Sequence, residues 1–483
     1  MKEFGLFING SFRRSADSLQ IKSPYSGDPV TLVSLADKKE IEEAVSSSIK
    51  AFQQTRSLPT YKRAEFLSAL KDSMIEQREN FARIITSEAG KPVVDARVEV
   101  DRSILTVSLA AEEARRISGE VIPLDIIPQN TGRFALTSRF PIGPVLSITP
   151  FNFPLNLGMH KVAPAIAAGN SVIWKPASQT PGAALHFAAL FASAAQKVDF
   201  PVEALNVVVT RSELAEYMVV DERVAMLSFT GSAPVGWHLK KICGKKKAAL
   251  ELGGNAGVII DADADLDYAV SRCITGGFSF AGQICISVQR IFVHEKVYRD
   301  FINKLVEAAQ SLICGDPEKE ETKVGPLISE HDVERILKWV DEARKDGAAL
   351  KNGGVRSGNI IEPTILTNVK PDMKVCCNEI FGPVVTVSPF TGWEDAIRAV
   401  NDSRFGLQAG VFTRNLERAF YAFQNLDVGG VVIGDVPTFR TDNMPYGGVK
   451  NSGQGREGVR YTMEEMTELK LMAFNLNPSP QKF

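Results

Sequence analysis

The chain is poor in cysteine, with six in 483 residues, and poorer still in histidine, with five. So sparse a set does not form a disulfide scaffold, and no two of the cysteines have the C-x-x-C spacing of zinc and redox sites. We therefore predict no metal site. Each cysteine is then either a small buried apolar residue or a nucleophile.

Long apolar runs and an excess of one charge are also missing. No stretch approaches the roughly 18 apolar residues that a membrane span needs, and the first ten residues include Lys2 and Glu3 where a signal peptide is apolar. The 55 Lys and Arg residues balance 57 Asp and Glu residues. We expect a cytoplasmic protein with no nucleic acid or membrane partner.

The length predicts two or more domains, because a single core usually stops growing before 483 residues. Between about 143 and 260, β-branched runs alternate with helical runs, which is typical of an open parallel sheet. The predicted strands are 145–148, 171–174, 206–209, 226–229 and 256–260, and the predicted helices are 155–168, 183–197, 212–218 and 235–243.

A second alternating region, 265–432, predicts a second α/β domain. Its clearest elements are helices at 298–311 and 332–345 and strands at 384–387 and 410–412. Two more strands, predicted at 133–139 and 466–474, lie outside both regions, and their unpaired edges invite pairing with another chain.

Cys285 lies in the segment Gly282-Gln283-Ile284-Cys285, with no aromatic side chain directly beside the sulfur. A thiolate there would attack a carbonyl carbon. The alternative, for any one free cysteine, is a small buried apolar residue. The neighbouring motifs have to decide between these interpretations.

Glu251 ends an apolar run and precedes Gly253 and Gly254, which let the backbone approach a ligand. Partial burial would raise the pKa of its carboxyl into the range of a general base. The alternative is a glutamate that merely leads into a Gly-Gly turn.

Asn152 lies between two prolines at the carboxyl end of the predicted strand 145–148, where open α/β sheets bind ligands. Its side-chain amide would stabilise an oxyanion. Taken alone, an asparagine in this setting is also an ordinary turn former.

The usual G-x-G-x-x-G dinucleotide motif is missing after the first of these strands. Phe229-Thr230-Gly231-Ser232 joins a strand to a helix instead, and its backbone N–H groups and serine hydroxyl would receive a phosphate. Lys175 and Ser178 follow another strand and would suit ribose hydroxyls or a 2′-phosphate. Plain turns are the alternative at both places.

Together, in this order and spacing, these segments resemble the aldehyde dehydrogenase superfamily over nearly the whole chain. The matching motifs are Pro150-Phe151-Asn152-Phe153-Pro154, Lys175-Pro176-Ala177-Ser178, Phe229-Thr230-Gly231-Ser232, Glu251-Leu252-Gly253-Gly254, Gly282-Gln283-Ile284-Cys285, Glu379-Ile380-Phe381-Gly382-Pro383, Pro445-Tyr446-Gly447-Gly448-Val449-Lys450 and Ser452-Gly453-Gln454-Gly455-Arg456-Glu457.

The resemblance implies oxidation of an aldehyde to a carboxylic acid. Cys285 would be the nucleophile, Asn152 and the Cys285 backbone N–H the oxyanion hole, and Glu251 the base that activates water to hydrolyse the thioester. Hydride would leave for a nicotinamide between those steps. Lys161 and Glu457 resemble the family's accessory proton-relay residues.

The implied cofactor is NAD or NADP. Many NAD-preferring members carry glutamate where this chain has Ser178, so NADP is admitted, and Arg211 would either contact a 2′-phosphate or belong to a capped helix start. The implied cofactor residues are Ile148, Thr149, Pro150, Lys175, Ser178, Arg211, Phe229, Gly231, Ser232, Leu252, Gly253, Glu379 and Phe381.

The implied fold is α/β, with a Rossmann-type NAD(P)-binding domain over 1–118 and 141–250 and a catalytic domain over 251–438. Bridging strands over 119–140 and 460–483 would build a homodimer or homotetramer. The implied substrate pocket comprises Phe153, Leu157, His160, Ile284, Ile286, Arg440 and Tyr446.

His160 and Arg440 suggest a small hydroxylated or anionic aldehyde, as in the lactaldehyde, succinate-semialdehyde, phosphonoacetaldehyde and glyceraldehyde-3-phosphate members. The alternative is a helix histidine that faces elsewhere and a surface arginine. Cys376 and Cys377 have no partner motif, and we expect them only to pack.

Three alternative functions differ in the residues that they require. A CoA-acylating relative usually lacks the water-activating glutamate, and here Glu251 is present. A non-catalytic relative would have lost the thiol of Cys285. A thiol hydrolase would need a histidine base, and none of the five histidines lies in an evident base motif.

Overall fold

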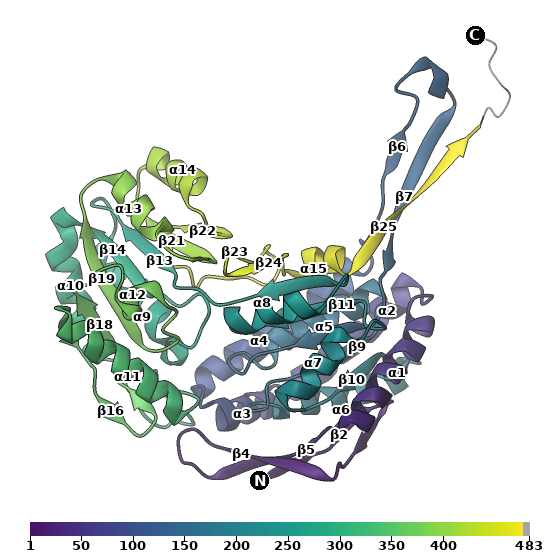
Figure 1. Ribbon diagram of the computed structural model, residues 1–483, viewed down its shortest axis with the longest axis horizontal. Coiled ribbons are helices and arrows are strands. Elements are labelled where there is room, and N and C mark those ends of the chain that lie inside the picture. Colours follow the sequence, from purple (N-terminus) through teal and green to yellow (C-terminus); the bar gives the residue numbers. More distant parts are fainter. Residues whose placement is uncertain (477–483) are drawn as a thin grey trace.

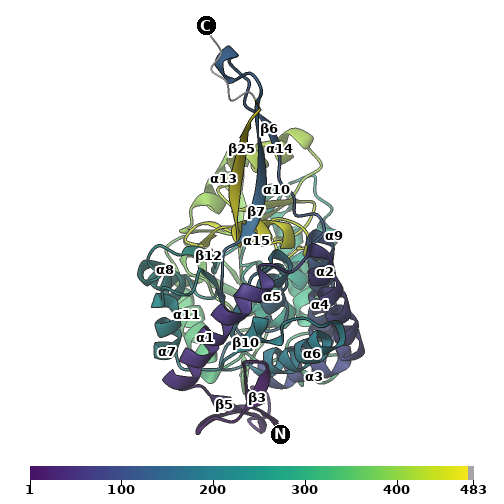
Figure 2. The same ribbon diagram turned by 90° about the vertical axis from the view of Figure 1, so that its right-hand side faces the viewer.

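The computed structural model describes residues 1–476 as two α/β units from which a narrow three-stranded sheet projects (Figures 1 and 2). The units are built on sheets of eight and seven strands, and each has its own apolar core.

The first unit contains the eight-stranded sheet, in the order β24-β12-β11-β8-β9-β10-β2-β3. The strands from β12 to β10 pair in parallel, and antiparallel strands complete both edges. The strands are β2 (Leu6–Ile8), β3 (Ser11–Arg13), β8 (Val145–Ile148), β9 (Val172–Lys175), β10 (Leu205–Val207), β11 (Met226–Thr230), β12 (Lys247–Glu251) and β24 (Gly453–Gln454).

Helices cover this sheet. They are α1 (Lys38–Thr55), α2 (Thr60–Glu76), α3 (Arg78–Ala89), α4 (Val93–Glu113), α5 (Asn156–Ala168), α6 (Gly182–Val198), α7 (Ser212–Val220), α8 (Ala233–Ile242) and α15 (Val459–Glu465). Every residue of α5 is buried, in keeping with a helix that is apolar nearly all round. The four helices predicted between 155 and 243 are present, with ends that differ by a few residues.

The second unit contains the seven-stranded sheet, in the order β15-β18-β19-β14-β13-β21-β22, parallel except for β15. Its strands are β13 (Gly257–Ile260), β14 (Arg290–His294), β15 (Ala349–Asn352), β18 (Thr364–Thr367), β19 (Val384–Phe390), β21 (Gln408–Phe412) and β22 (Gly430–Ile433). Its helices are α9 (Leu266–Phe278), α10 (Glu295–Gln310), α11 (Glu330–Lys345), α12 (Lys374–Cys377), α13 (Trp393–Asn401) and α14 (Leu416–Asn425).

One strand assignment was wrong. The run 256–260 was predicted to end the first sheet, but β13 lies at the centre of the second sheet, between β14 and β21. The first sheet instead continues through β12, which ends at Glu251. A strand buried on both faces is a continuous apolar run in either sheet, so its pattern does not reveal its neighbours.

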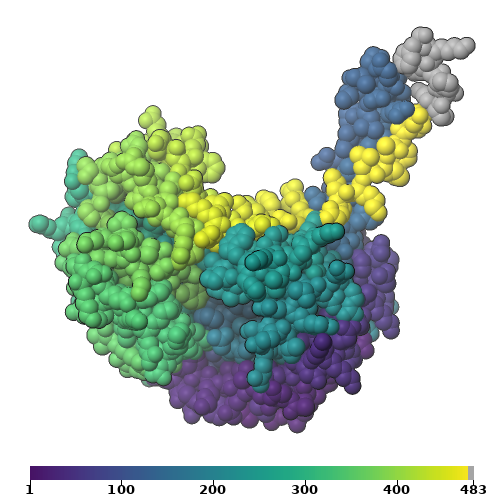
Figure 3. Space-filling view, viewed as in Figure 1, coloured from purple at the N-terminus to yellow at the C-terminus, as the bar shows by residue number. Residues whose placement is uncertain are grey.

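The projecting sheet joins β25 (Thr467–Asn475), β7 (Arg133–Pro141) and β6 (Val121–Pro123). It stands clear of both units (Figure 3). The expected bridging segment 460–483 belongs to the projecting sheet only in part. Its first residues form the end of α15, which packs against α5 and α4 of the first unit, and β25 begins only at Thr467. Residues 477–483 of that segment lie outside the described residues.

The N-terminal strands β1 (Lys2–Phe4), β4 (Asp17–Lys22) and β5 (Pro29–Leu35) form a separate sheet beside the first unit. Short pairs join β16 (Arg356–Ser357) to β17 (Ile360–Ile361) and β20 (Phe405–Gly406) to β23 (Val449–Lys450). Among residues 1–476, no helix is long and apolar enough to cross a membrane, and no group of His, Cys, Asp and Glu could hold a metal ion.

Candidate active site

The candidate nucleophile lies on a sharply turned segment between the two cores. Phe280, Ala281 and Gly282 all have positive φ, at 47°, 52° and 69°. Phe280 packs into the first core and Ala281 into the second. Non-glycine residues in this backbone region are strained and must be held by their surroundings, so the packing of both units fixes the approach to Cys285.

Cys285 lines a cavity of about 270 Å³. Six of the seven expected pocket residues line it as well: Phe153, Leu157, Ile284, Ile286, Arg440 and Tyr446. The seventh, His160, does not line the cavity and is fully buried. The cavity also contains residues that the sequence did not indicate, among them Lys91, Asp95, Glu99, Arg102, Arg272 and Thr438.

Asn152 extends from the end of β8 to the segment that holds Cys285. Its side-chain Nδ2 donates a 2.9 Å hydrogen bond to the carbonyl oxygen of Gln283, and the residue is only 3% exposed. An amide group carries two N–H bonds, so the second remains for a ligand atom beside the thiol.

Glu251 is buried where β12 ends, with neither carboxylate oxygen bonded to any described residue. Burial, followed by the negative charge of Glu457, raises the pKa of Glu251 well above its usual value. A buried carboxyl without a partner is costly to ionise. Glu251 therefore holds a proton at pH values where an exposed glutamate is charged.

Lys161 and Glu457 form a buried ion pair next to Glu251. The Lys161 Nζ lies 2.5 Å from Oε1 of Glu457, and both side chains are at most 2% exposed. Burial alone would raise the pKa of Glu457, but the charge of Lys161 and the nearby His160 and Arg440 lower it to about 2. Glu457 is thus the ionised member of the two neighbouring glutamates.

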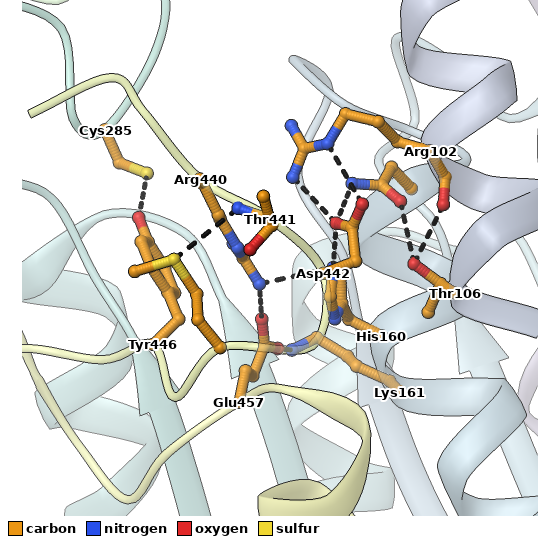
Figure 4. Close-up of polar contacts among 12 residues, drawn as sticks. Arg102, Thr106, His160, Lys161, Cys285, Arg440, Thr441, Asp442, Tyr446 and Glu457 are labelled. Atoms are coloured by element: carbon orange, nitrogen blue, oxygen red, sulfur yellow. Dashed lines mark hydrogen bonds and ion pairs between the residues drawn. The ribbon is translucent and has the colours of Figure 1, made fainter. Parts of the chain in front are cut away.

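His160, Asp442 and Arg102 form a second buried network (Figure 4). Oδ1 of Asp442 lies 2.8 Å from Nε2 of His160 and accepts a 2.7 Å hydrogen bond from Nη2 of Arg102. These contacts hold the pKa of Asp442 well below its usual range even though burial opposes this. Burial, followed by the charge of Arg440, lowers the pKa of His160, so its ring is neutral at physiological pH.

Arg440 and Tyr446 connect this network to the thiol (Figure 4). The guanidinium of Arg440 lies 3.7 Å from the centre of the Tyr446 ring, and the Tyr446 hydroxyl oxygen lies 2.9 Å from Sγ of Cys285. Nη2 of Arg440 also contacts Nε2 of His160 at 3.3 Å and Oε2 of Glu457 at 3.4 Å. The thiol, the phenol and the guanidinium thus line one charged cavity.

The sequence profile of the aldehyde dehydrogenase family matches residues 12–472. The chain belongs to this family. It is 42% identical over 477 residues to the 3-sulfolactaldehyde dehydrogenase of Priestia aryabhattai, with 99% of each chain covered. It is 41% identical over 466 residues to the lactaldehyde dehydrogenase of Methanocaldococcus jannaschii, with 96% of this chain and 99% of that one covered.

Solved structures agree with this assignment. Aldehyde dehydrogenase 21 from Physcomitrella patens, in complex with the reaction product succinate, superposes with a TM-score of 0.96 at 41% identity over 99% of both chains. Glyceraldehyde-3-phosphate dehydrogenase from Methanocaldococcus jannaschii, complexed with NADP, superposes with a TM-score of 0.92 at 40% identity over 96% of this chain and 99% of that one. The α/β fold class and the NAD(P)-dependent oxidation of an aldehyde are confirmed.

Several of the expected cofactor residues of this aldehyde dehydrogenase lie where strands of the first sheet end. Ser232 immediately precedes α8 and does not cap it with its side chain, so the first N–H groups of that helix can receive a phosphate. Lys175 ends β9, and burial lowers the pKa of its ammonium. Thr149 follows β8 and accepts a 2.9 Å hydrogen bond from the indole N–H of Trp174.

Glu379 approaches the backbone that follows Glu251. It accepts a 3.0 Å hydrogen bond from the N–H of Gly254, and a Cβ on Gly253 would lie 2.0 Å from its Oε2. Only glycine permits this approach. Burial raises the pKa of Glu379 to about 7. A carboxyl beside an open glycine turn fits a ribose of NAD or NADP.

The other expected cofactor residues have varied surroundings. Arg211 is exposed and pairs with Asp17, with its Nη2 2.9 Å from Oδ2. Phe381 has a positive φ of 54° and its ring meets that of Phe151 edge to face. The remaining ones, at or next to strand ends, are Ile148, Pro150, Ser178, Phe229, Gly231 and Leu252.

Sequence reasoning missed Arg102 and Asp442. Arg102 lies on α4 and is separated from Asp442 by 340 residues, and an arginine on a helix surface has the same pattern as a solvated charge. The one available signal was the spacing of Arg440-Thr441-Asp442, which places a carboxylate two residues after a pocket arginine.

Proposed function

We propose that this aldehyde dehydrogenase oxidises a small anionic aldehyde to its carboxylate, with Cys285 as the nucleophile. The observation that carries the proposal is the charge of Arg440 in the cavity beside Cys285. Its side chain is only 5% exposed, and among the described residues the only carboxylate within 4 Å is Glu457, at 3.4 Å.

Arg440 has spare hydrogen-bonding capacity. Its Nε is buried and has no partner among residues 1–476. Buried cations in proteins are normally paired and hydrogen-bonded, because removing the charge from water is costly. An anionic group of the substrate would offset the charge of this guanidinium, which a neutral aldehyde would not do.

Two more arginines support an anionic substrate. Arg102 and Arg272 line the same cavity, and each is held by one aspartate, Asp442 or Asp435. Fixing a guanidinium in advance lowers the entropy lost when an anion binds. The names of the relatives agree with this inference, since 3-sulfolactaldehyde and the succinate product both carry an anionic group remote from the reacting carbon.

The residues can perform the reaction as follows. The thiolate of Cys285 attacks the carbonyl carbon. The resulting oxyanion accepts hydrogen bonds from the second side-chain N–H of Asn152 and from the backbone N–H of Cys285. NAD or NADP, when bound, supplies the acceptor for the hydride that leaves this thiohemiacetal. Glu251 then takes a proton from the water that attacks the thioester, the Cys285 thiolate leaves, and the carboxylate product is formed.

Glu251 suits the last step because its pKa is raised well above the usual value by burial. A base of higher pKa takes a proton from water more readily. The adjacent Lys161–Glu457 pair, joined at 2.5 Å, would pass that proton on. Transfer of the acyl group to CoA instead would need no such base, so the presence of Glu251 favours hydrolysis.

The residues expected near the adenosine ribose bear on the preference for NAD or NADP. Ser178 offers no carboxylate to repel a 2′-phosphate, and Lys175 offers a cation close by in the chain. We therefore propose that the enzyme accepts NADP as well as NAD. Arg211 would reach a 2′-phosphate only by giving up its exposed pair with Asp17, which surface pairs allow at little cost.

The projecting sheet supports an oligomer. Leu469, Leu471 and Met472 on β25 are 54–57% exposed, and Phe140 on β7 is 41% exposed. Contiguous exposed apolar side chains on a free sheet mark a contact surface. We propose a homodimer or homotetramer built through this sheet. A cytoplasmic location stays a prediction from the sequence.

The test is the reduction of NAD and of NADP at 340 nm with pairs of aldehydes that share a carbon skeleton and differ in one anionic group. The informative pairs are 3-sulfolactaldehyde against lactaldehyde and succinate semialdehyde against butanal, with glyceraldehyde 3-phosphate as a further anion and with and without CoA. We expect kcat/KM to be at least tenfold higher for the anionic member, no requirement for CoA, and no turnover by Cys285→Ala. Equal kcat/KM within both pairs would refute an anionic substrate.

A further inference from the structure

The hydroxyl of Tyr446 is the only polar side-chain group in contact with the Cys285 sulfur within residues 1–476, at 2.9 Å. The tyrosine cannot easily move away. Its backbone N–H and carbonyl both bond to the backbone of Glu457, at 2.9 and 2.6 Å, and its ring packs against Ile286 and Leu407 in a small cluster around the thiol.

A cation lies over the same ring. The guanidinium of Arg440 is 3.7 Å from the ring centre of Tyr446, and both side chains are nearly fully buried. A cation over the face of a phenol draws electron density from the ring and is more effective where water is excluded. The Tyr446 O–H bond is therefore polarised in the direction that makes it a stronger donor.

The charges around Cys285 decide which of the two groups ionises. Burial and the neighbouring Cys285 raise the pKa of Tyr446 well above its usual value, so the phenol stays protonated. Burial raises the pKa of Cys285 to about 11, the Tyr446 hydrogen bond and Arg440 lower it, and Glu379 and Glu251 raise it. Since the phenol keeps its proton, a thiolate at this position accepts the hydrogen bond.

We propose that Tyr446 is a further catalytic residue, whose hydroxyl donates a hydrogen bond to the Cys285 sulfur and stabilises its thiolate form, and that Arg440 positions and strengthens this donor. The inference rests on the proposed role of Cys285 as the nucleophile. The hydrogen bond acts twice. It stabilises the thiolate before the attack on the aldehyde. It stabilises the thiolate again when water cleaves the thioester and the sulfur leaves.

Glu251 does not take over this task. Neither of its carboxylate oxygens forms a hydrogen bond to the sulfur. The two residues therefore have separate roles: Tyr446 stabilises the thiolate, and Glu251 takes a proton from the attacking water.

The test measures the thiolate directly, without cofactor or aldehyde. The full-length protein is alkylated with iodoacetamide from pH 6 to pH 11, and modification of the Cys285 peptide is followed by mass spectrometry. For Tyr446→Phe, which keeps the ring and removes only the hydroxyl, we expect the alkylation rate at each pH below 9 to fall about 10- to 100-fold, the effect of losing one hydrogen bond to a charged group. Tyr298→Phe is the matched control, because its hydroxyl bonds a carbonyl on β19, and its profile should equal that of the parent.

A second variant keeps the test decisive if Tyr446→Phe does not fold. Arg440→Met leaves the hydroxyl in place and removes the cation over the ring, and we expect a smaller fall in the alkylation rate. An unchanged or faster alkylation rate in Tyr446→Phe would overturn the inference, because the hydroxyl would then only accept a hydrogen bond from the thiol. Retained turnover by Cys285→Ala would instead refute the nucleophile, and the two failures are thereby told apart.

Discussion

Replacement of Arg440 by methionine tests the substrate class most directly. The buried guanidinium forms one ion pair, with Glu457 at 3.4 Å, and its Nε has no partner among the described residues. A hydrogen bond to a charged group contributes about 1.5–3 kcal/mol, and two unit charges 4 Å apart near a protein surface interact by about 4 kcal/mol. Glu457 already offsets part of the charge. We therefore expect Arg440→Met to lose about 2–3 kcal/mol of transition-state stabilisation for an anionic substrate.

That energy corresponds to a loss of roughly 30- to 150-fold in kcat/KM. The variant will also disturb Glu457 and Tyr446, which slows all substrates. The ratio of kcat/KM for 3-sulfolactaldehyde to that for lactaldehyde removes this common effect, because the two aldehydes differ only in the anionic group. We expect the ratio to fall by the stated factor in Arg440→Met and to stay constant in Arg356→Met, which loses an arginine on the short strand β16.

A fall of less than about threefold in this ratio would correspond to under about 0.7 kcal/mol and would refute the contact between Arg440 and the anionic group. An equal loss for both aldehydes would assign Arg440 to the positioning of Tyr446 and Glu457 alone. Circular dichroism and the melting temperature of the variant separate either outcome from a failure to fold.

Three other predictions concern buried polar groups. Asn152→Ala should lower kcat by roughly two to three powers of ten with little change in KM, because an oxyanion donor acts in the transition state; stopped-flow kinetics that show a normal kcat would contradict this role. Glu251→Gln should keep a burst of one NAD(P)H per active site and lose the steady-state rate, and the parent kcat should rise with pH through the raised pKa of Glu251; a missing burst would place Glu251 before hydride transfer. Burial raises the pKa of Glu88 from 4.5 to about 7, although bonds from Thr31 and Gly182 oppose this. The unfolded chain then loses its proton first, so stability should fall by up to about 3 kcal/mol between these pH values. Chemical denaturation of Glu88→Gln should show a flatter pH dependence, and parallel curves would argue against it.

Much of the site was predictable because its main groups belong to local motifs. Asn152 follows β8 and Glu251 ends β12, and both strands are parallel members of one sheet. The carboxyl ends of such strands meet at one edge, so residues at strand ends converge without any long-range knowledge. Cys285 was left open by its own segment, Gly282-Gln283-Ile284-Cys285, and was proposed from the resemblance of the motifs taken together.

Other features depended on packing between distant segments. The run 256–260 has the pattern of a buried strand, and that pattern alone did not assign it to the second sheet, where it lies between β14 and β21. The bridging segment was placed from 460, yet α15 is held in the first unit by its contacts with α4 and α5. Apolar periodicity shows that a face is buried but does not name its partner.

The sequence by itself predicted the two α/β regions, the family and the three candidate groups Cys285, Asn152 and Glu251, because alternation, strand ends and short motifs are local properties of the chain. Only the tertiary structure decided the charge around them. Arg102 meets Asp442 across 340 residues, and Arg440 lies over Tyr446 beside the thiol. Which charges share a cavity depends on how α4, α5 and the 438–446 segment pack, and packing brings together residues whose spacing along the chain carries no signal.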